Sequence, residues 1–182
     1  MNRRLMMAQQ NKGFELVYDA ASGTLPKASD GWVFTSNGNT TTTVRNGYLK
    51  ISGDGSWLQP RATLEIEKPQ DLTKSKEVVV TVGNVYRFAV RYQITEPWFY
   101  IEDYARPMIL VYTTFSTPLF KQETQIKYQT IKSVYNASTK TISYYLNDTL
   151  IFTETNSIPK KFKLEFFGEH FLEVSQITYK EW

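Results

Sequence analysis

The sequence contains no cysteine among its 182 residues. This absence excludes a disulfide-stapled secreted scaffold, a thiolate nucleophile and any metal site with cysteine ligands. There is one histidine, His170, and no Gly-x-Ser-x-Gly turn, so a Ser-His-Asp triad has little support. A P-loop and a Gly-x-Gly-x-x-Gly sequence are also missing, which removes the common nucleotide-binding signatures.

Long apolar runs and a strong charge of one sign are missing as well. A membrane-spanning helix needs about 18 apolar residues in a row, and a signal peptide needs about seven or more. The only apolar run near the start is Leu5–Ala8. We therefore expect no membrane association and no signal peptide, and a protein located in a virion or otherwise in the cytoplasm. The net charge of +3 is close to balance, which does not favour a nucleic-acid partner.

Aromatic residues are plentiful, with 12 tyrosines and 11 phenylalanines, and these types favour strands. Many short segments alternate apolar and polar residues, with turn signals between them, and no long segment has a helical period. The sequence predicts an all-β fold, a two-sheet antiparallel β-sandwich. One set of alternating side chains should form the core: Phe88, Val90, Tyr92, Leu110, Ile142, Tyr144, Leu146, Phe162, Leu164, Phe166 and Ile177.

The chain divides into a basic arm, residues 1–13, and one sandwich domain, residues 14–182. Arg3, Arg4 and Lys12 give the arm its charge, and we expect them to dock onto a partner. Within the domain, Asn46-Gly47 predicts a type I′ hairpin turn, and Asn147-Asp148 marks a second turn. Pro97 and Pro107 bracket an aromatic segment, which makes a regular central strand less expected there.

Several of these segments resemble the concanavalin A-like, laminin-G-like jelly rolls. The matching stretches are residues 19–26 leading to Gly31-Trp32, Asn46–Ile51, Tyr135–Asp148, Phe166-Phe167-Gly168 and Val174–Tyr179. The resemblance covers roughly residues 14–182 and implies a lectin-like jelly roll. It departs from the family at Asp148, where glycine is usual, and it lacks an acidic calcium loop. We therefore expect no metal and no cofactor.

Modules of this kind with a short arginine-containing start are similar to components of tailed bacteriophages. The resemblance implies a fibre, decoration or tail protein that attaches to a glycan or host-surface polysaccharide. Other virion proteins or copies of the chain are further expected partners. The alternative is a purely structural virion protein whose sandwich mediates assembly.

A glycan site needs flat aromatic faces for sugar rings and nearby polar groups for hydroxyls. Aromatic side chains in or beside turn segments meet the first need, and their polar neighbours meet the second. The predicted ligand-binding residues are Trp57, Trp98, Tyr100, Glu102, Asp103, Tyr104 and Arg106. The competing interpretation is that these aromatics cap the sandwich or pack against a partner chain.

Catalysis has weaker support. Glycosidases use two carboxylates that flank the scissile bond. Glu165 and Glu169 lack the spacing of a known family, and Glu102 and Asp103 are adjacent, so on a strand they would point to opposite faces. We predict that the protein is not an enzyme. A polysaccharide hydrolase or lyase with acids on separate strands stays open as a lesser alternative.

Overall fold

The computed structural model describes residues 13–53, 60–96, 98–103, 107–112, 118–124 and 127–182. Some strand residues are described by their backbone alone, namely Arg87, Phe88, Tyr92, Trp98, Phe99, Ile101, Glu102, Asp103, Pro107, Tyr112 and Glu169. No helix in these ranges has the length and apolar character to cross a membrane.

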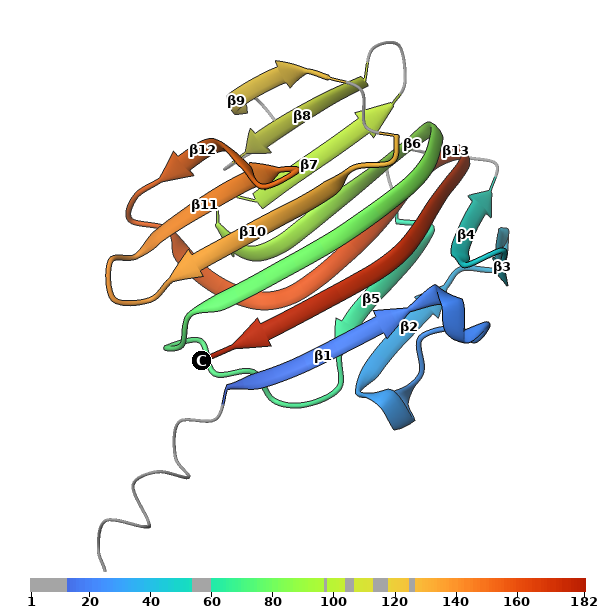
Figure 1. The fold of residues 1–182 in the computed structure, drawn as a ribbon, viewed down its shortest axis with the longest axis horizontal. Helices are drawn as coiled ribbons and strands as arrows, with labels where there is room; N and C mark the ends of the chain where they lie inside the picture. The colour runs from blue at the N-terminus through green and yellow to red at the C-terminus, as the bar shows by residue number, and fades with distance from the viewer. Residues whose placement is uncertain (1–12, 54–59, 97, 104–106, 113–117, 125–126) are drawn as a thin grey trace, which may run out of the picture.

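The described part of the chain forms thirteen strands and two short 3-10 turns, η1 (Ala20–Ser22) and η2 (Ala28–Asp30) (Figure 1). The strands are β1 (Phe14–Asp19), β2 (Trp32–Ser36), β3 (Thr40–Arg45), β4 (Tyr48–Gly53), β5 (Ala62–Ile66), β6 (Lys76–Glu96), β7 (Trp98–Asp103), β8 (Pro107–Tyr112), β9 (Pro118–Glu123), β10 (Thr130–Asn136), β11 (Thr141–Leu146), β12 (Thr149–Glu154) and β13 (Ile158–Glu181).

All strand pairs are antiparallel, and they make two layers. One layer has the order β12-β11-β10-β6-β13-β1 and uses residues 76–81 of β6 and 176–181 of β13. The other has the order β9-β8-β7-β6-β13-β5-β2 and uses the far halves of the two long strands. The fold is thus an antiparallel two-sheet β-sandwich, as the sequence predicts.

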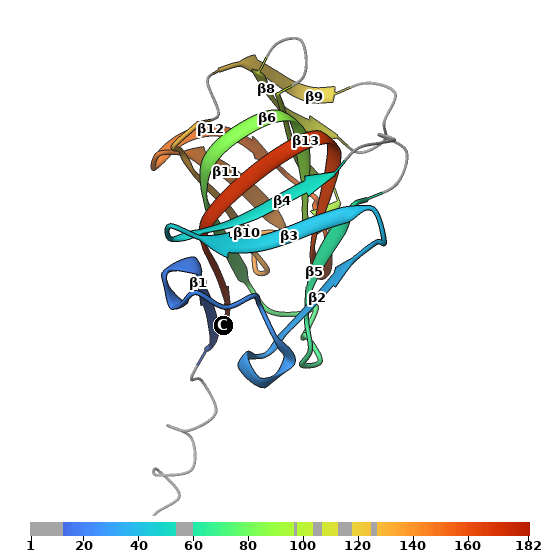
Figure 2. The ribbon, with the colours of Figure 1, turned by 90° about the vertical axis from the view of Figure 1, so that its right-hand side faces the viewer.

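The long strands β6 and β13 connect the two layers. Figure 2 shows both strands curving over from one layer to the other. Their pairing shifts register between Gly168 and Phe171 and again between Leu172 and Gln176, so the side-chain phase changes along the bend. The β3–β4 hairpin pairs with β13 at this bend, through residues 171–174.

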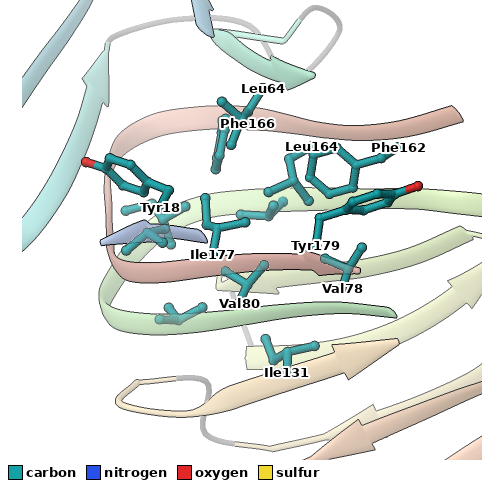
Figure 3. Close-up of a cluster of buried hydrophobic side chains, with 14 of the residues drawn as sticks. Tyr18, Leu64, Val78, Val80, Ile131, Phe162, Leu164, Phe166, Ile177 and Tyr179 are labelled. Atoms are coloured by element: carbon teal, nitrogen blue, oxygen red, sulfur yellow. The ribbon is translucent and has the colours of Figure 1, made fainter. Parts of the chain in front are cut away.

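Apolar side chains from both layers meet between them. In Figure 3, Phe162, Leu164 and Phe166 on one half of β13 lie across from Ile177 and Tyr179 on its other half. The rings of Phe162 and Tyr179 are 5.4 Å apart between centroids. Of the predicted core, eight side chains are nearly fully buried: Val90, Leu110, Ile142, Tyr144, Phe162, Leu164, Phe166 and Ile177. Leu146 packs against the core at its margin, and the side chains of Phe88 and Tyr92 lie outside the described ones.

The predicted turns are confirmed. Asn46 and Gly47 have φ values of 54° and 76°, and they join β3 to β4 with Arg45 paired to Tyr48. Two successive positive φ angles define a type I′ turn. Asn147 and Asp148 repeat the geometry between β11 and β12, with φ values of 46° and 63°.

Two sequence expectations are wrong. The first is that the alternating segments are all short. Residues 78–82 and 88–94 belong to one long bent strand, β6, and the last two apolar segments belong to another, β13. The segment between Pro97 and Pro107 contains a regular strand, β7, hydrogen-bonded to β6 and β8. Pro107 stands at the first position of β8, the end of the β7–β8 ladder, where a missing N–H is tolerated.

Candidate functional site

The predicted ligand-binding residues are described only in part. Trp57, Tyr104 and Arg106 lie outside the described residues, and so do the arm residues Arg3, Arg4 and Lys12. Trp98, Glu102 and Asp103 lie on β7, and their side chains are outside the described part. Tyr100 is described: it is half-buried, and its backbone is paired with Arg91 on β6 and Leu110 on β8.

The neighbours of Tyr100 include a charged cluster. Arg91 is paired with Glu165 on β13, and its Nε and Nη2 groups both donate to Oε2 of that carboxylate. The other oxygen, Oε1, lies 3.2 Å from Nζ of Lys163. Both oxygens of Glu165 therefore already have cationic partners within the protein. A glycosidase nucleophile or acid must instead be free to engage the substrate.

This side of the β7 layer is largely covered. Ala89, Leu110, Glu165 and Phe167 are all nearly fully buried, although Ala89, Leu110 and Phe167 lie outside the main core cluster. Ala89 is therefore covered as well, although it precedes the core residue Val90 and points to the opposite face of β6. The described residues of this surface leave little open area for a large ligand.

A more open surface lies where β6 and β13 bend. A hollow of about 590 Å³, which we call the bend pocket, is lined by Thr43, Arg45, Asn46, Tyr48, Lys50, Ser52, Asn84 and Glu173. Its lining residues lie on the β3–β4 hairpin and on the bends of β6 and β13. Figure 2 shows this hairpin beside the bent part of β13. The volume lies within the range of small-ligand pockets, roughly 300–1,000 Å³.

The pocket's shape follows from local backbone chemistry. Gly83, just before Asn84, has no side chain, and the Tyr48 ring occupies the space where one would be. The type I′ turn at Asn46-Gly47 sets the register that places Thr43 opposite Lys50 and Arg45 opposite Tyr48. Period-2 alternation then sends Leu49 and Ile51 into the core, and leaves Tyr48, Lys50 and Ser52 on the pocket side.

One carboxylate in the pocket is held in place by an amide. Oε2 of Glu173 accepts hydrogen bonds from the backbone N–H of Asn84 at 3.3 Å and from its Nδ2 at 3.1 Å. Lys50 is the cross-strand partner of Glu173. The Lys50 ammonium forms no ion pair with Glu173 and lies over the Phe171 ring, 4.2 Å from the ring centroid.

The Phe171 ring lies against the pocket residue Lys50, and together with Tyr86 and His170 it forms what we call the aromatic cluster. Phe171 is paired with Ser52 of the pocket on one side and with Tyr86 on the other. The Tyr86 and His170 rings are 4.9 Å apart between centroids, and Tyr86 is 49% exposed. A half-exposed ring beside a polar hollow provides a flat apolar face next to hydrogen-bonding groups.

Other hollows lined by described residues lack such a face. One of about 500 Å³ includes Tyr135, and one of about 410 Å³ includes Tyr18 and Trp32, but these three rings are almost completely buried. Among the described residues, no three His, Asp or Glu side chains gather closely enough to hold a metal ion. The bend pocket and the aromatic cluster therefore make the best-defined candidate site.

No protein-family model matches this sequence, and no curated protein matches it either. Solved structures do. The chain is similar to peanut lectin, with a TM-score of 0.61 and 9% identity over 94% of this chain and 98% of that one. It is also similar to the metal-free carbohydrate recognition domain of Emp46p, with a TM-score of 0.60 and 7% identity over 82% and 87% of the two chains.

A third similar structure is a native glycosidic hydrolase, with a TM-score of 0.55 and 12% identity over 93% and 95% of the two chains. At such identities these likenesses establish the fold. The fold is a lectin-type, concanavalin A-like jelly roll, as the sequence resemblance implies. Jelly rolls host binding proteins as well as enzymes, so the function has to be argued from the site.

Sequence reasoning missed the candidate site. Tyr86 and Phe171 are distant in the sequence and meet only because β6 and β13 pair at their bends. Gly83-Asn84 was a usable signal, because a glycine inside a run of valines marks a bend or a close approach of another group. The alternation of apolar and polar residues is interrupted at Gly83-Asn84. Tyr86 itself carries no sign that distinguishes it from other strand residues.

Proposed function

We propose that this chain is a non-catalytic carbohydrate-binding jelly roll, and that it binds a saccharide at the bend pocket and the aromatic cluster. One observation carries the proposal: the half-exposed Tyr86 ring, tilted against His170, lies beside the Phe171 ring, and Phe171 contacts Lys50 of a hollow that also offers an amide, a carboxylate and several hydroxyl groups. The C–H face of a sugar ring packs on an aromatic face, and its hydroxyls bond to such polar groups.

The fold adds support. The similar structures include a lectin and a carbohydrate recognition domain, so the same scaffold holds saccharides in other proteins. The proposal that the site binds without catalysis rests on the number of carboxylates in the bend pocket. Among the described lining residues, Glu173 is the one carboxylate, and its Oε2 is bonded to Asn84. Hydrolysis by the usual route needs two carboxylates across the bond.

A glycan array with the full chain tests the proposal. We expect binding to a subset of glycans, lost or reduced about tenfold in Tyr86→Ala, since a stacking contact of this kind contributes on the order of 1 kcal/mol or more. Tyr128→Ala is the matched control, because Tyr128 is also exposed and lies outside the pocket lining and the aromatic cluster. Absence of binding to every glycan, with the protein folded, would contradict the proposal.

A glycosidase is the second candidate, favoured by the similarity to a glycosidic hydrolase. Its acids would lie on the β7 layer, where Glu165 is a buried carboxylate and Glu102 lies two residues from Tyr100 on β7. Reducing-sugar release from a polysaccharide panel tests it. Turnover that disappears in Glu165→Gln or Glu102→Gln would replace the binding proposal with the enzymatic one.

The setting is a separate proposal. Attachment of a phage virion to a host-surface glycan, and assembly with virion proteins or copies of the chain, rest on the sequence resemblance alone. The binding surface predicted at Trp98, Tyr100 and Tyr104 is part of this separate proposal. Loss of binding or assembly in Trp98→Ala and Tyr104→Ala, with stability kept, supports that surface, while simple unfolding assigns these aromatics to the core.

A further inference from the structure

The bend pocket has more positive than negative charge. Arg45 and Lys50 line it, and neither forms an ion pair with a carboxylate of the described residues. Glu173 is the nearest acid across the strand pair, yet its Oε2 bonds to Asn84 rather than to Lys50. Two cations thus face the hollow without an acidic partner in that part of the chain.

The two cations are held in different ways. Lys50 lies over the Phe171 ring, at the border between pocket and aromatic cluster. A cation–π contact at a half-exposed site is weak, about 0.5–1 kcal/mol, so the ammonium keeps its capacity to bind an anion. Arg45 is exposed at the start of the hairpin turn. Its planar guanidinium can donate two parallel hydrogen bonds to a carboxylate.

We propose that the saccharide bound here is acidic: a sugar residue with a carboxylate, as in uronic or sialic acids. Its ring packs on the aromatic cluster, and its carboxylate bonds to Lys50 and Arg45. The hydroxyls bond to Asn84 and to the threonine and serine groups of the pocket. This inference rests on the proposed carbohydrate binding, and it adds the substrate class and the residues that select it.

Matched ligands separate the inference from the proposal beneath it. The probes are uronic- and sialic-acid-containing oligosaccharides, each paired with its carboxyl-reduced counterpart, in which the carboxylate is a neutral alcohol. We expect at least about tenfold tighter binding of the acidic member, because a hydrogen bond to a charged group contributes more than a neutral one. The preference should weaken as salt rises, since the charges are partly solvent-exposed.

Substitutions locate the preference. Lys50→Gln and Arg45→Gln should each lower affinity for the acidic member about tenfold and affinity for the reduced member distinctly less, because a hydrogen bond to a neutral hydroxyl contributes less than one to a carboxylate. Lys161→Gln removes the same charge from an exposed lysine outside the pocket lining, and should change neither. Lys50→Arg, which keeps the charge, should retain most of the binding. Melting temperatures show whether each variant is folded.

Each remaining outcome has a definite meaning. Binding of neutral glycans alone overturns the acidic inference and leaves the carbohydrate-binding proposal standing. Equal losses on both members in Lys50→Gln overturn the assigned role of the charge. Preference for sulfated over carboxylated glycans also overturns the carboxylate assignment. Absence of any glycan binding removes the proposed function and the inference together.

Discussion

The Tyr48 ring fills the space beside Gly83 where a side chain would be. A Cβ placed on Gly83 would lie 2.6 Å from Cε1 of Tyr48 and 3.1 Å from Cβ of Glu173. This contact joins the β4 strand to the bend of β6, and it also shapes one wall of the bend pocket. The same contact therefore holds two strands of the bend together and shapes the candidate site.

Gly83→Ala should destabilise the protein by about 1–3 kcal/mol, the usual cost of overpacking, and should disturb glycan binding by moving Tyr48. Chemical denaturation measures the loss. Gly38→Ala is the control, because nothing lies within 4 Å of a Cβ there, and its effect should stay within about 0.5 kcal/mol. In a Tyr48→Ala background the Gly83→Ala cost should shrink; if it stays unchanged, Tyr48 is not the clashing group.

The turns and the buried face could be predicted from the sequence because both depend on local rules. Asn46-Gly47 accepts two positive φ angles at low cost, and alternation marks Leu164 and Phe166 as core. The bends of β6 and β13 could not be predicted this way. Strand continuity across Gly83 depends on pairing with residues about 90 positions later, as between Val82 and Val174, and local sequence does not encode that pairing.

The candidate site depends on the same long-range pairing, so its residues were not predicted. Tyr86 and Phe171 carry no local signature of a site, and they meet only once the bends are aligned. The segment between Pro97 and Pro107 stands out in the sequence because its aromatic residues are consecutive. Consecutive aromatic residues are a poor sign of a binding surface on a strand, because neighbouring side chains alternate between two faces.

Arg91 and Glu165 offer a test of buried charge. The Glu165 side chain is 6% exposed, and Arg91 binds one of its oxygens with two donors. Arg91→Leu should cost roughly 3–5 kcal/mol, because it leaves the Oε2 atom of a buried carboxylate without its guanidinium, while Lys163 contacts only the other oxygen. The double variant with Glu165→Leu should recover much of that loss.

An exposed pair provides the control. Lys180 and Glu15 are 3.5 Å apart with both side chains about half exposed, so Lys180→Ala should cost no more than about 1 kcal/mol. Denaturation curves for the single and double variants give the coupling free energy. Equal costs for Arg91→Leu and Lys180→Ala would show that burial does not decide the strength of the Arg91 pair.

Buried tyrosines should make the protein sensitive to alkali. Burial raises the pKa of Tyr18 to about 12, with a contribution from the negative charge of Asp19. Burial also raises the pKa values of Tyr144 and Tyr179. A tyrosine ionises near pH 10 in the unfolded chain, so the stabilisation is complete below about pH 10 and is lost as pH rises through about 12.

Thermal melts between pH 7 and pH 12 measure this loss. Tyr18→Phe should flatten the decline above pH 10, and should cost about 0.5–1.5 kcal/mol at pH 7, because the Tyr18 hydroxyl donates to the Thr24 carbonyl oxygen at 3.1 Å. Tyr128→Phe, at an exposed tyrosine, should leave the profile unchanged. A Tyr18→Phe profile that declines as steeply as the parent would assign the loss to other groups.

Removal of the N-terminal residues tests the predicted basic arm. The first strand begins at Phe14, and its six residues pair with residues 176–181 of β13. Deleting residues 1–13 should therefore leave the melting temperature nearly unchanged, and it should weaken assembly if Arg3, Arg4 and Lys12 dock onto a partner. Light scattering measures assembly; a large fall in melting temperature would mean that these residues contribute to the fold.

The two type I′ turns differ at one position, and this difference allows a reciprocal exchange. Gly47 has a φ of 76° with nothing within 4 Å of a Cβ, whereas Asp148 holds a φ of 63° despite its side chain. A left-handed conformation costs an ordinary residue about 1–2 kcal/mol, and somewhat less for aspartate. Asp148→Gly should therefore relieve strain.

The same substitution removes an ion pair. Asp148 lies 2.7 Å from Nζ of Lys132, but its side chain is 84% exposed, and such pairs contribute about 0.2–1 kcal/mol. Strain relief should exceed this loss, so we expect Asp148→Gly to be neutral or to stabilise by up to about 1 kcal/mol. Gly47→Asp should destabilise by a similar or larger amount, because it places a side chain at a φ of 76°. Urea denaturation of both variants measures the change in the free energy of unfolding. A clear loss of stability in Asp148→Gly would show that the Lys132 pair outweighs the backbone strain.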